Sequence, residues 1–245
     1  MHPELLRALV HTDNYVAGAR RGTELIGASV GFRAAEDGVP SLHSHVTGIA
    51  EAAQGSGVGT ALKRHQRRWA LARGLGTVTW TFDPLVRRNG WFNLMRLGAE
   101  VTAYHPDFYG KMADRLNAGD AGDRVVATWV LDSERAVTAL SGDGAGPGPD
   151  VDALVEAGAP TILDEGPDGA PSPIPLPTLA PGAGATLLCR VPSDIVALRR
   201  SSPLLARAWR AALRATMGAA MDDGYRAGAM SRSGCYVLVP PGASA

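Results

Sequence analysis

The chain has 245 residues, enough for one full domain core with a smaller attachment. Its 24 Lys and Arg residues balance 24 Asp and Glu residues, so the formal net charge is zero. A neutral chain has no overall field that attracts nucleic acid, an acidic membrane or a polyanionic substrate. With 45% hydrophobic and 20% charged residues, the chain is expected to fold around a sizeable core.

The two cysteines, Cys189 and Cys235, are too few for a disulfide framework or a structural zinc site, so no metal centre is expected. The N-terminus lacks a basic region followed by an apolar one, and no apolar run approaches the roughly 18 residues of a membrane span. No basic patch is interleaved with aromatic residues. These features predict a cytoplasmic protein with neither a membrane nor a nucleic-acid partner.

The N-terminal part predicts a short helix followed by an antiparallel meander. Residues 3–10 place leucines on one helical face. Three short apolar runs follow, separated by turn sequences: 15–19, 25–32 and 42–50. Consecutive strands joined by short turns favour antiparallel pairing.

After the meander, helical and strand patterns alternate. Residues 59–73 form an amphipathic pattern that ends at a glycine, and residues 77–82 read as a buried strand. A second helix runs to Leu97, with Gly98 as its cap. Two more strands are expected at 101–104 and 125–131, joined by a polar segment that contains Asp114, Arg115 and Asn117. The sheet then has about six strands.

The last part of the chain divides at a segment dense in Gly, Pro and Ala. Residues 136–185 are expected to form a linker with one short ordered element near 151–157. Beyond it the pattern predicts a strand, a helix and a strand, at 186–191, 203–222 and 235–239. This unit is too small for its own core and is expected to dock on the first. The predicted units are therefore 1–135, 136–185 and 186–245.

The most informative stretch is a strand, a glycine-rich turn and a helix over residues 47–61. The glycines let the backbone approach a ligand, and the first amides of the helix have no intrahelical acceptor, so such a terminus binds phosphate. A mononucleotide P-loop is excluded, because no Gly-Lys-Ser/Thr opens the helix, and the dinucleotide pattern Gly-x-Gly-x-x-Gly fails on spacing. The pattern that remains is Gln-x-x-Gly-x-Gly, with Gln54, Gly57 and Gly59.

This pattern resembles the signature of the GNAT superfamily of N-acetyltransferases, in which the turn binds the pyrophosphate of coenzyme A. Residues 77–82 resemble the family's next strand, and 88–99 resemble a helix that ends in Leu-Gly, so the resemblance covers residues 15 to 131. Residues 42–45 also resemble a poorly characterised branch with a second small unit. The implied fold is α+β, with a mixed, mostly antiparallel central sheet flanked by helices and a small C-terminal strand-helix-strand unit docked on it.

The resemblance implies an acyl-coenzyme A, expected to be acetyl-CoA, as co-substrate, and no metal. The residues expected to bind it are Gly48, Ile49, Gln54, Gly55, Ser56, Gly57, Val58, Gly59, Thr60 and Asn93. A basic run follows the turn, consisting of Lys63, Arg64, Arg67 and Arg68. It is either a contact for the 3′-phosphate of coenzyme A or a solvated helix face.

The sequence departs from the family pattern in two ways. The family begins with a strand and a helix, and Met1 falls inside the region expected for that helix. Leu94 also stands where many members place the tyrosine that protonates the departing thiolate. Tyr104, His105 and Tyr109 are the nearest replacements, and Tyr109 is our candidate.

Direct acyl transfer to an amine needs a base, and histidine titrates near neutral pH. His43 and His45 are two residues apart on a predicted strand, so they face the same side. The resemblance puts His45 near the position of a base glutamate in many relatives. The alternative is that both are half-buried and bonded to neighbouring carbonyls. Asp83 is a second candidate for the base, or alternatively an N-cap for the next helix.

These residues predict an acyl-CoA dependent N-acyltransferase that acts on a small-molecule amine, with an amino acid as one option. The alternative is a catalytically silent module that senses acyl-CoA, which the missing tyrosine and N-terminal elements keep open. A homodimer is also left open.

Overall fold

The computed structural model describes residues 2–36, 38–110, 122–141, 146–174, 176 and 184–243. It forms two compact units. Unit 1 comprises Met1–Trp80 and Thr128–Asp143, and unit 2 comprises Thr81–Ala127 and Gly144–Ala245. Strands β4 (Thr77–Phe82) and β6 (Arg124–Val130) each contain residues of both units.

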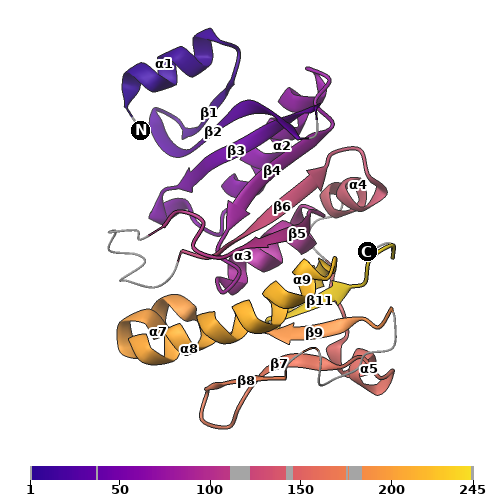
Figure 1. The fold of residues 1–245 in the computed structure, drawn as a ribbon. Coiled ribbons are helices and arrows are strands. Elements are labelled where there is room, and N and C mark those ends of the chain that lie inside the picture. Colours follow the sequence, from indigo (N-terminus) through magenta and orange to yellow (C-terminus); the bar gives the residue numbers. More distant parts are fainter. Residues whose placement is uncertain are drawn as a thin grey trace. The chain divides into compact units, whose positions relative to one another are not determined.

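Unit 1 is a mixed sheet with helices. Besides its parts of β4 and β6, it contains α1 (Pro3–His11), β1 (Tyr15–Arg21), β2 (Glu24–Glu36), β3 (Val39–Ile49), η1 (Glu51–Ala53), α2 (Val58–Leu71) and α4 (Glu134–Ser141). Strands β1, β2 and β3 pair antiparallel in chain order, which confirms the predicted meander (Figure 1). Strand β4 pairs parallel with β3, since α2 carries the chain back between them.

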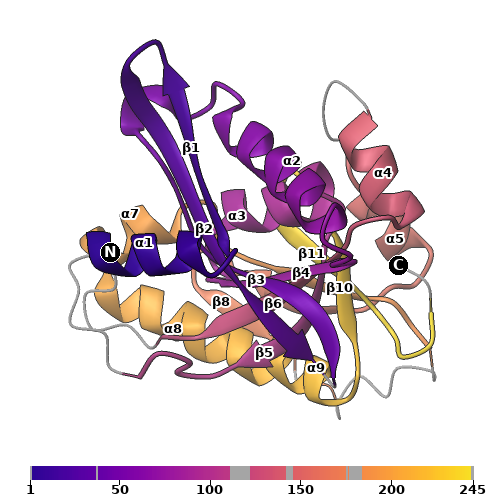
Figure 2. The same ribbon diagram turned by 90° about the horizontal axis from the view of Figure 1, so that it is seen from above.

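Helices α1 and α2 of unit 1 lie on opposite sides of the β1–β2 hairpin (Figure 2). Helix α2 packs on β1, β2 and β3 through an apolar stripe that includes Leu62 and Ala70. Gly27 of β2 permits this approach, because a Cβ there would lie 3.0 Å from Cγ1 of Val58. The first residue of α2 is therefore held against the sheet, and the preceding turn is fixed with it.

Unit 2 is also a mixed, mostly antiparallel sheet. Its helices and strands, besides its parts of β4 and β6, are α3 (Arg87–Trp91), the π-helical turn η2 (Phe92–Arg96), β5 (Glu100–His105), α5 (Val151–Glu156), β7 (Thr161–Glu165), β8 (Pro171–Pro173), β9 (Leu187–Arg190), α7 (Ile195–Ser201), α8 (Pro203–Leu213), the π-helical turn η3 (Arg214–Gly218), α9 (Ala219–Asp222), β10 (Arg226–Met230) and β11 (Cys235–Val239). The strands follow the order β5-β10-β11-β9-β7-β8. Only the β7–β9 pairing is parallel among these described pairs.

Strand β11 lies inside this sheet, between β10 and β9. Its first four residues are buried, and Leu188, Cys235 and Val237 form a cluster covered by Val151 and Leu154 of α5. Burial raises the pKa of the Cys235 thiol to about 11, so the group stays protonated at neutral pH. Cys189 is buried as well, so both cysteines serve in packing.

The segment expected to be a linker is more ordered than its composition indicates. Within 136–185 the structure contains most of α4 and all of α5, β7 and β8. Strand β7 is ordered by parallel pairing with β9, and Trp209 Nε1 of α8 donates to the Gly169 carbonyl at 3.0 Å. The units divide at other positions than the predicted boundaries 135 and 185, since residues 81–127 group with the C-terminal residues. The polar segment with Asp114, Arg115 and Asn117 lies outside the described residues.

Candidate functional site

The predicted glycine-rich turn is an exposed loop at the start of α2. Gly55 has φ 76° and Gly57 has φ 84°, in the left-handed region that glycine alone adopts readily. A Cβ on either residue would meet no atom within 4 Å. Glycine is therefore required here by the backbone conformation, and the space above the turn is open.

The amides at the start of α2 are available to a ligand. The Ala61 N–H donates to the Gly57 carbonyl at 3.0 Å, whereas the N–H groups of Val58, Gly59 and Thr60 have no acceptor among the described residues. Unpaired amides and the helix dipole both favour an anion at this position. The turn can therefore bind a phosphate group.

Strands β3 and β4 separate close to this turn. They pair at Leu42 with Val78 and at His43 with Thr79, and no registered pair follows in the described residues of either strand. In the ladder with β2, His45 is a bulge without a partner. A bulge bends its strand, which accounts for the divergence. Beyond it, residues 46–49, which include Gly48 and Ile49, have no partner on the β4 side, so an extended polar ligand can bind there.

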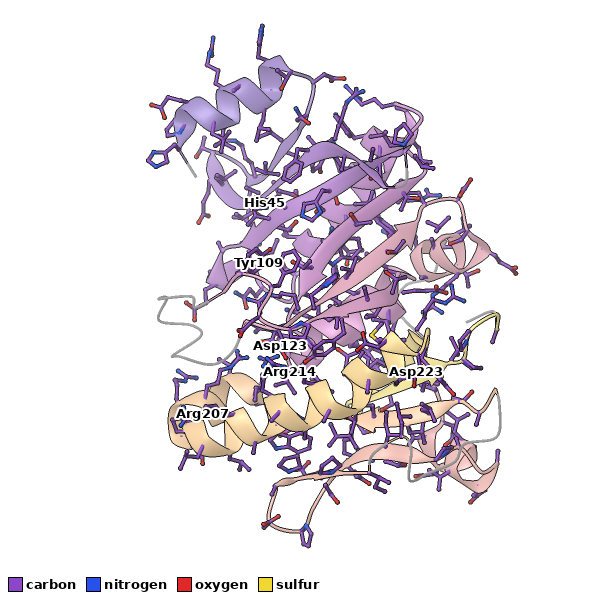
Figure 3. All side chains as sticks on the ribbon, in the orientation of Figure 1. His45, Tyr109, Asp123, Arg207, Arg214 and Asp223 are labelled. Atoms are coloured by element: carbon purple, nitrogen blue, oxygen red, sulfur yellow. The ribbon has the colours of Figure 1, made fainter. Side chains whose placement is uncertain are left out.

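The two histidines of β3 lie on one face, as predicted, and both rings lie against Phe32. Figure 3 labels His45. Their ring centroids are 6.4 Å apart, and the Phe32 ring lies 5.0 Å from His43 and 5.8 Å from His45. Burial lowers the pKa of His43, and the nearby charges of His45 and Lys63 lower it further, so His43 is neutral at pH 7. Neither imidazole has a hydrogen-bond partner in the described part of the chain. This differs from the alternative in which both rings bond to neighbouring carbonyls. His45 is exposed and His43 is half-buried.

The arginines after the turn border a cavity of about 270 Å³ in unit 1. Its lining residues are Arg64, Arg67, Arg68, Val137, Leu140 and Ser141. Arg64 Nη2 donates to the Leu140 carbonyl at 2.6 Å, and Arg67 Nε donates to the Leu131 carbonyl at 2.7 Å. None of the three guanidinium groups forms an ion pair with a carboxylate of the described residues. The cavity is therefore suited to an anion.

Asp83, the second candidate base, lies buried in unit 2 at 8% exposure. Arg210 contacts both of its carboxylate oxygens at 2.8 Å, and Arg199 contacts Oδ2. Burial alone would raise the pKa of Asp83, but Arg210 and Arg199 together outweigh it and lower the pKa to about 2. So strongly ionised a carboxylate is a weak proton acceptor. It also accepts the Leu85 N–H, two residues on, rather than capping α3.

The candidate proton donors of unit 2 differ in access. Tyr104 is buried and donates to Asp123 Oδ2 at 2.6 Å, and its pKa is raised by burial and by the Asp123 charge. Tyr109 is 47% exposed, and its hydroxyl lies 3.1 Å from Thr81 Oγ1. Asn93, expected near the cofactor, lies in η2 with 4% exposure. Of the two tyrosines, Tyr109 is therefore the accessible one.

The most buried ion pairs among the described residues of unit 2 join residues far apart in the chain, and the sequence analysis did not identify their arginine partners. Asp123, fully buried, accepts from Tyr104, from the Asp107 N–H and from Arg214 of η3 (Figure 3). A signal was present at Arg210, which lies four residues after buried Ala206 in an apolar helix and so occupies a core position.

No described helix is long and apolar enough to cross a lipid bilayer. Among the same residues, no group of three or more His, Cys, Asp or Glu side chains could hold a metal ion.

Comparison with known proteins gives matches among solved structures alone. No family model matches the sequence, and no curated protein matches it. A GNAT family acetyltransferase from Elizabethkingia anophelis with acetyl-CoA bound is 16% identical, with 53% of this chain and 83% of that chain covered and a TM-score of 0.43. A putative acetyltransferase from Salmonella typhimurium with acetyl-CoA is also 16% identical, covering 54% and 72%, with a TM-score of 0.45.

A third similar structure is the ribosomal-protein-S18-alanine N-acetyltransferase from Escherichia coli, which is 12% identical. The alignment covers 54% of this chain and 79% of the Escherichia coli chain, with a TM-score of 0.43. All three are described as acetyltransferases, the Salmonella typhimurium protein as a putative one. Each alignment covers about half of this chain, and identities this low leave the function to be inferred from the site.

Proposed function

We propose that the chain is an acyl-CoA dependent N-acyltransferase that uses acetyl-CoA and acts on a small-molecule amine, with an amino acid as one option. The observation that carries this proposal is the open glycine turn with unpaired amides beside the separation of β3 from β4. The pyrophosphate binds at the turn from Gln54 to Thr60, on the unpaired amides of Val58, Gly59 and Thr60. The pantetheine arm, which carries amides, pairs with the free edge of β3 at Gly48 and Ile49.

In this reaction the amine nitrogen attacks the thioester carbonyl, the carbon–sulfur bond breaks, and the thiolate takes up a proton. His45 is the proposed base, because its exposed imidazole has no partner among the described residues and can accept the proton of the substrate ammonium. Tyr109, which the sequence analysis names as the candidate donor to the thiolate, has an exposed hydroxyl in unit 2. Asp83 is assigned to the structure of unit 2 rather than to proton transfer, because two arginines hold it ionised.

The alternative function is a silent acyl-CoA sensor. One observation favours it: Leu94, at the position of the family's tyrosine, is only 1% exposed and carries no proton to donate. The two functions differ in turnover. Release of free coenzyme A in the presence of candidate amines supports the enzyme, whereas tight binding of acetyl-CoA without release for any amine supports the sensor.

Replacing the proposed base gives a direct test. His45→Ala is expected to lower turnover by about 10²-fold or more, the usual contribution of a general base. Affinity for coenzyme A is expected to persist, because the turn is unchanged. His43→Ala is the matched control on the same face and should lose less. Steady-state rates of both variants from pH 5.5 to 9 decide the matter: normal turnover in His45→Ala with the wild-type loss of rate at acid pH would remove His45 from the mechanism.

The arginine cavity gives a second test, because coenzyme A differs from dephospho-coenzyme A by its 3′-phosphate alone. We expect the double variant Arg64→Gln, Arg68→Gln to weaken coenzyme A binding by about tenfold, the size of two exposed charge contacts, and to leave dephospho-coenzyme A unchanged. Arg7→Ala, an exposed arginine of α1, is the control. Equal losses for the two ligands, measured by calorimetry, would place the 3′-phosphate elsewhere.

A further inference from the structure

Lys63 of α2 is a buried lysine without a carboxylate partner among the described residues. It is 5% exposed, and its Nζ donates to Ser44 Oγ at 3.0 Å and to Gln66 Oε1 at 3.0 Å. The same nitrogen lies 3.8 Å from the centroid of the Trp80 ring. Burial of an ammonium group without a counter-ion is unfavourable, so packing alone does not explain a lysine at this position.

The contacts of Lys63 coincide with the point where β3 and β4 separate. His43 and Thr79 are the last registered pair, and Ser44 and Trp80 are the next residue of each strand. Lys63 therefore binds the first residue of both strands beyond their last pair. Ser44 also directly precedes the bulge at His45, so the ammonium group lies where β3 turns away from β4.

Gln66 and Trp80 have few polar or aromatic partners besides Lys63 among the described residues. Gln66 is fully buried, and its Nε2 has no hydrogen-bond partner in the described part of the chain, so its bond to Lys63 is the one that the structure shows for this amide. The Trp80 ring packs edge-on against Trp129 with centroids 6.1 Å apart. Trp80 thus lies against Lys63 and Trp129, and loss of the ammonium charge removes the cation–π attraction between Lys63 and Trp80.

Burial lowers the pKa of Lys63 to about 7, and it is the one resolved cause of the shift. Charged and titratable side chains on α2 and on the strands packed against it add no resolved effect to the pKa of Lys63: Arg64, His65, Arg67 and Arg68 of α2, Tyr15, Arg20 and Arg21 of β1, Glu24 and Arg33 of β2, and His45 of β3. His43 of β3 does feel the Lys63 charge, which lowers the pKa of that imidazole. Lys63 is therefore charged below about pH 7 and neutral above it.

We propose that the Lys63 ammonium group is a positioning residue for the acyl-CoA site, which fixes the separation of β3 from β4 when it is charged and loosens it when it is neutral. This inference rests on the proposed function, because acyl-CoA is the ligand placed at that opening. A neutral amine loses the attraction to the face of Trp80 and becomes a weaker donor to Ser44. The opening is then less well ordered before the ligand binds.

The proposal predicts how ligand affinity changes with pH. Dephospho-coenzyme A is the probe, because it lacks the phosphate monoester that titrates near pH ~6. Wild-type affinity is expected to fall about three- to tenfold between pH 6 and pH 8.5, which is less than the full energy of a desolvated cation–π contact because only the ordering of the opening is lost. Lys63→Met is expected to bind more weakly at pH 6 and to lack this change. Lys63→Arg stays charged from pH 6 to pH 8.5. It should therefore retain its affinity for the probe over this whole range.

As the pH rises, the effect of Lys63 on the free energy of unfolding is expected to be opposite to its effect on probe affinity. The pKa of Lys63 falls from 10.5 to about 7 on folding, so its burial opposes folding fully below about pH 7, and this opposition fades as the pH rises toward 10.5. Lys63→Met should therefore melt at pH 6 at the wild-type temperature or above it, while binding the probe less well. A lysine that serves stability alone would lower both quantities together when replaced.

Two outcomes separate the inference from the proposed function. Identical pH profiles of probe affinity in wild type and Lys63→Met overturn the role of Lys63 while acyl-CoA binding stands. If neither protein binds the probe at any pH, the proposed function fails, and amide hydrogen exchange of residues 46–49 without ligand decides whether Lys63 orders β3. After correction for intrinsic rates, faster exchange at pH 8.5 than at pH 6 in wild type, but not in Lys63→Met, supports that ordering, and equal behaviour rejects it.

Discussion

A chain that ends after Ser133 is expected to be insoluble or unfolded. Strand β5 would lose β10, with which it pairs at Val101 and Ala227. Asp83 would lose both arginines, and Asp123 would lose Arg214. Leaving the buried charge of Asp83 without its arginines costs about 3 to 5 kcal/mol, a large share of the roughly 5 to 15 kcal/mol that stabilise a whole domain.

Expression yield and circular dichroism of the truncated chain test this expectation. A folded truncated protein with full turnover would show that the C-terminal residues are an accessory. Because truncation removes many contacts at once, Arg210→Met isolates the ion pair with Asp83 and should destabilise the protein by about 3 to 5 kcal/mol in denaturant titrations. Arg207→Met, an exposed arginine on the same helix (Figure 3), is the matched control and should stay within about 0.5 kcal/mol of wild type.

Gly57→Val is expected to abolish coenzyme A binding, with a loss of affinity of roughly 100-fold or more. Valine is strongly disfavoured at φ 84°, so the turn would change conformation and redirect the amides of α2. If the backbone instead kept its present conformation, the valine side chain would occupy the open space that we assign to the phosphate. Calorimetry with coenzyme A measures the loss, after circular dichroism has shown that the variant is folded.

The control for this change is Gly74→Val, just beyond the other end of α2. Gly74 has φ 70°, and a Cβ there would also meet no atom within 4 Å, so the substitution adds comparable strain away from the turn. It should reduce stability and leave coenzyme A affinity unchanged. Wild-type affinity in a folded Gly57→Val protein would contradict the assignment of the turn.

Local patterns in the sequence were sufficient for the elements that lead to the candidate site. The β-branched and aromatic residues of 77–82 predict β4 at its observed bounds, and short turns between apolar runs predict the β1–β2–β3 meander. The two-residue spacing of His43 and His45 places both rings on one face. These features depend on backbone geometry within a few residues, which the sequence encodes directly.

Tertiary structure alone decided the features that depend on a partner distant in the chain. Composition favoured a linker where β7 now pairs with β9, and Asp83 resembled a helix cap until Arg199 and Arg210, more than 100 residues away, surrounded it. Lys63 belongs to a basic run that predicts a solvated face, yet it shares the buried stripe of α2 with Leu62 and Ala70. The divergence of β3 from β4 follows a bulge at His45 that only the pairing with β2 defines. Sequence determines propensity over one turn or strand, whereas burial, ion pairing and register depend on which distant surfaces the folded chain brings together.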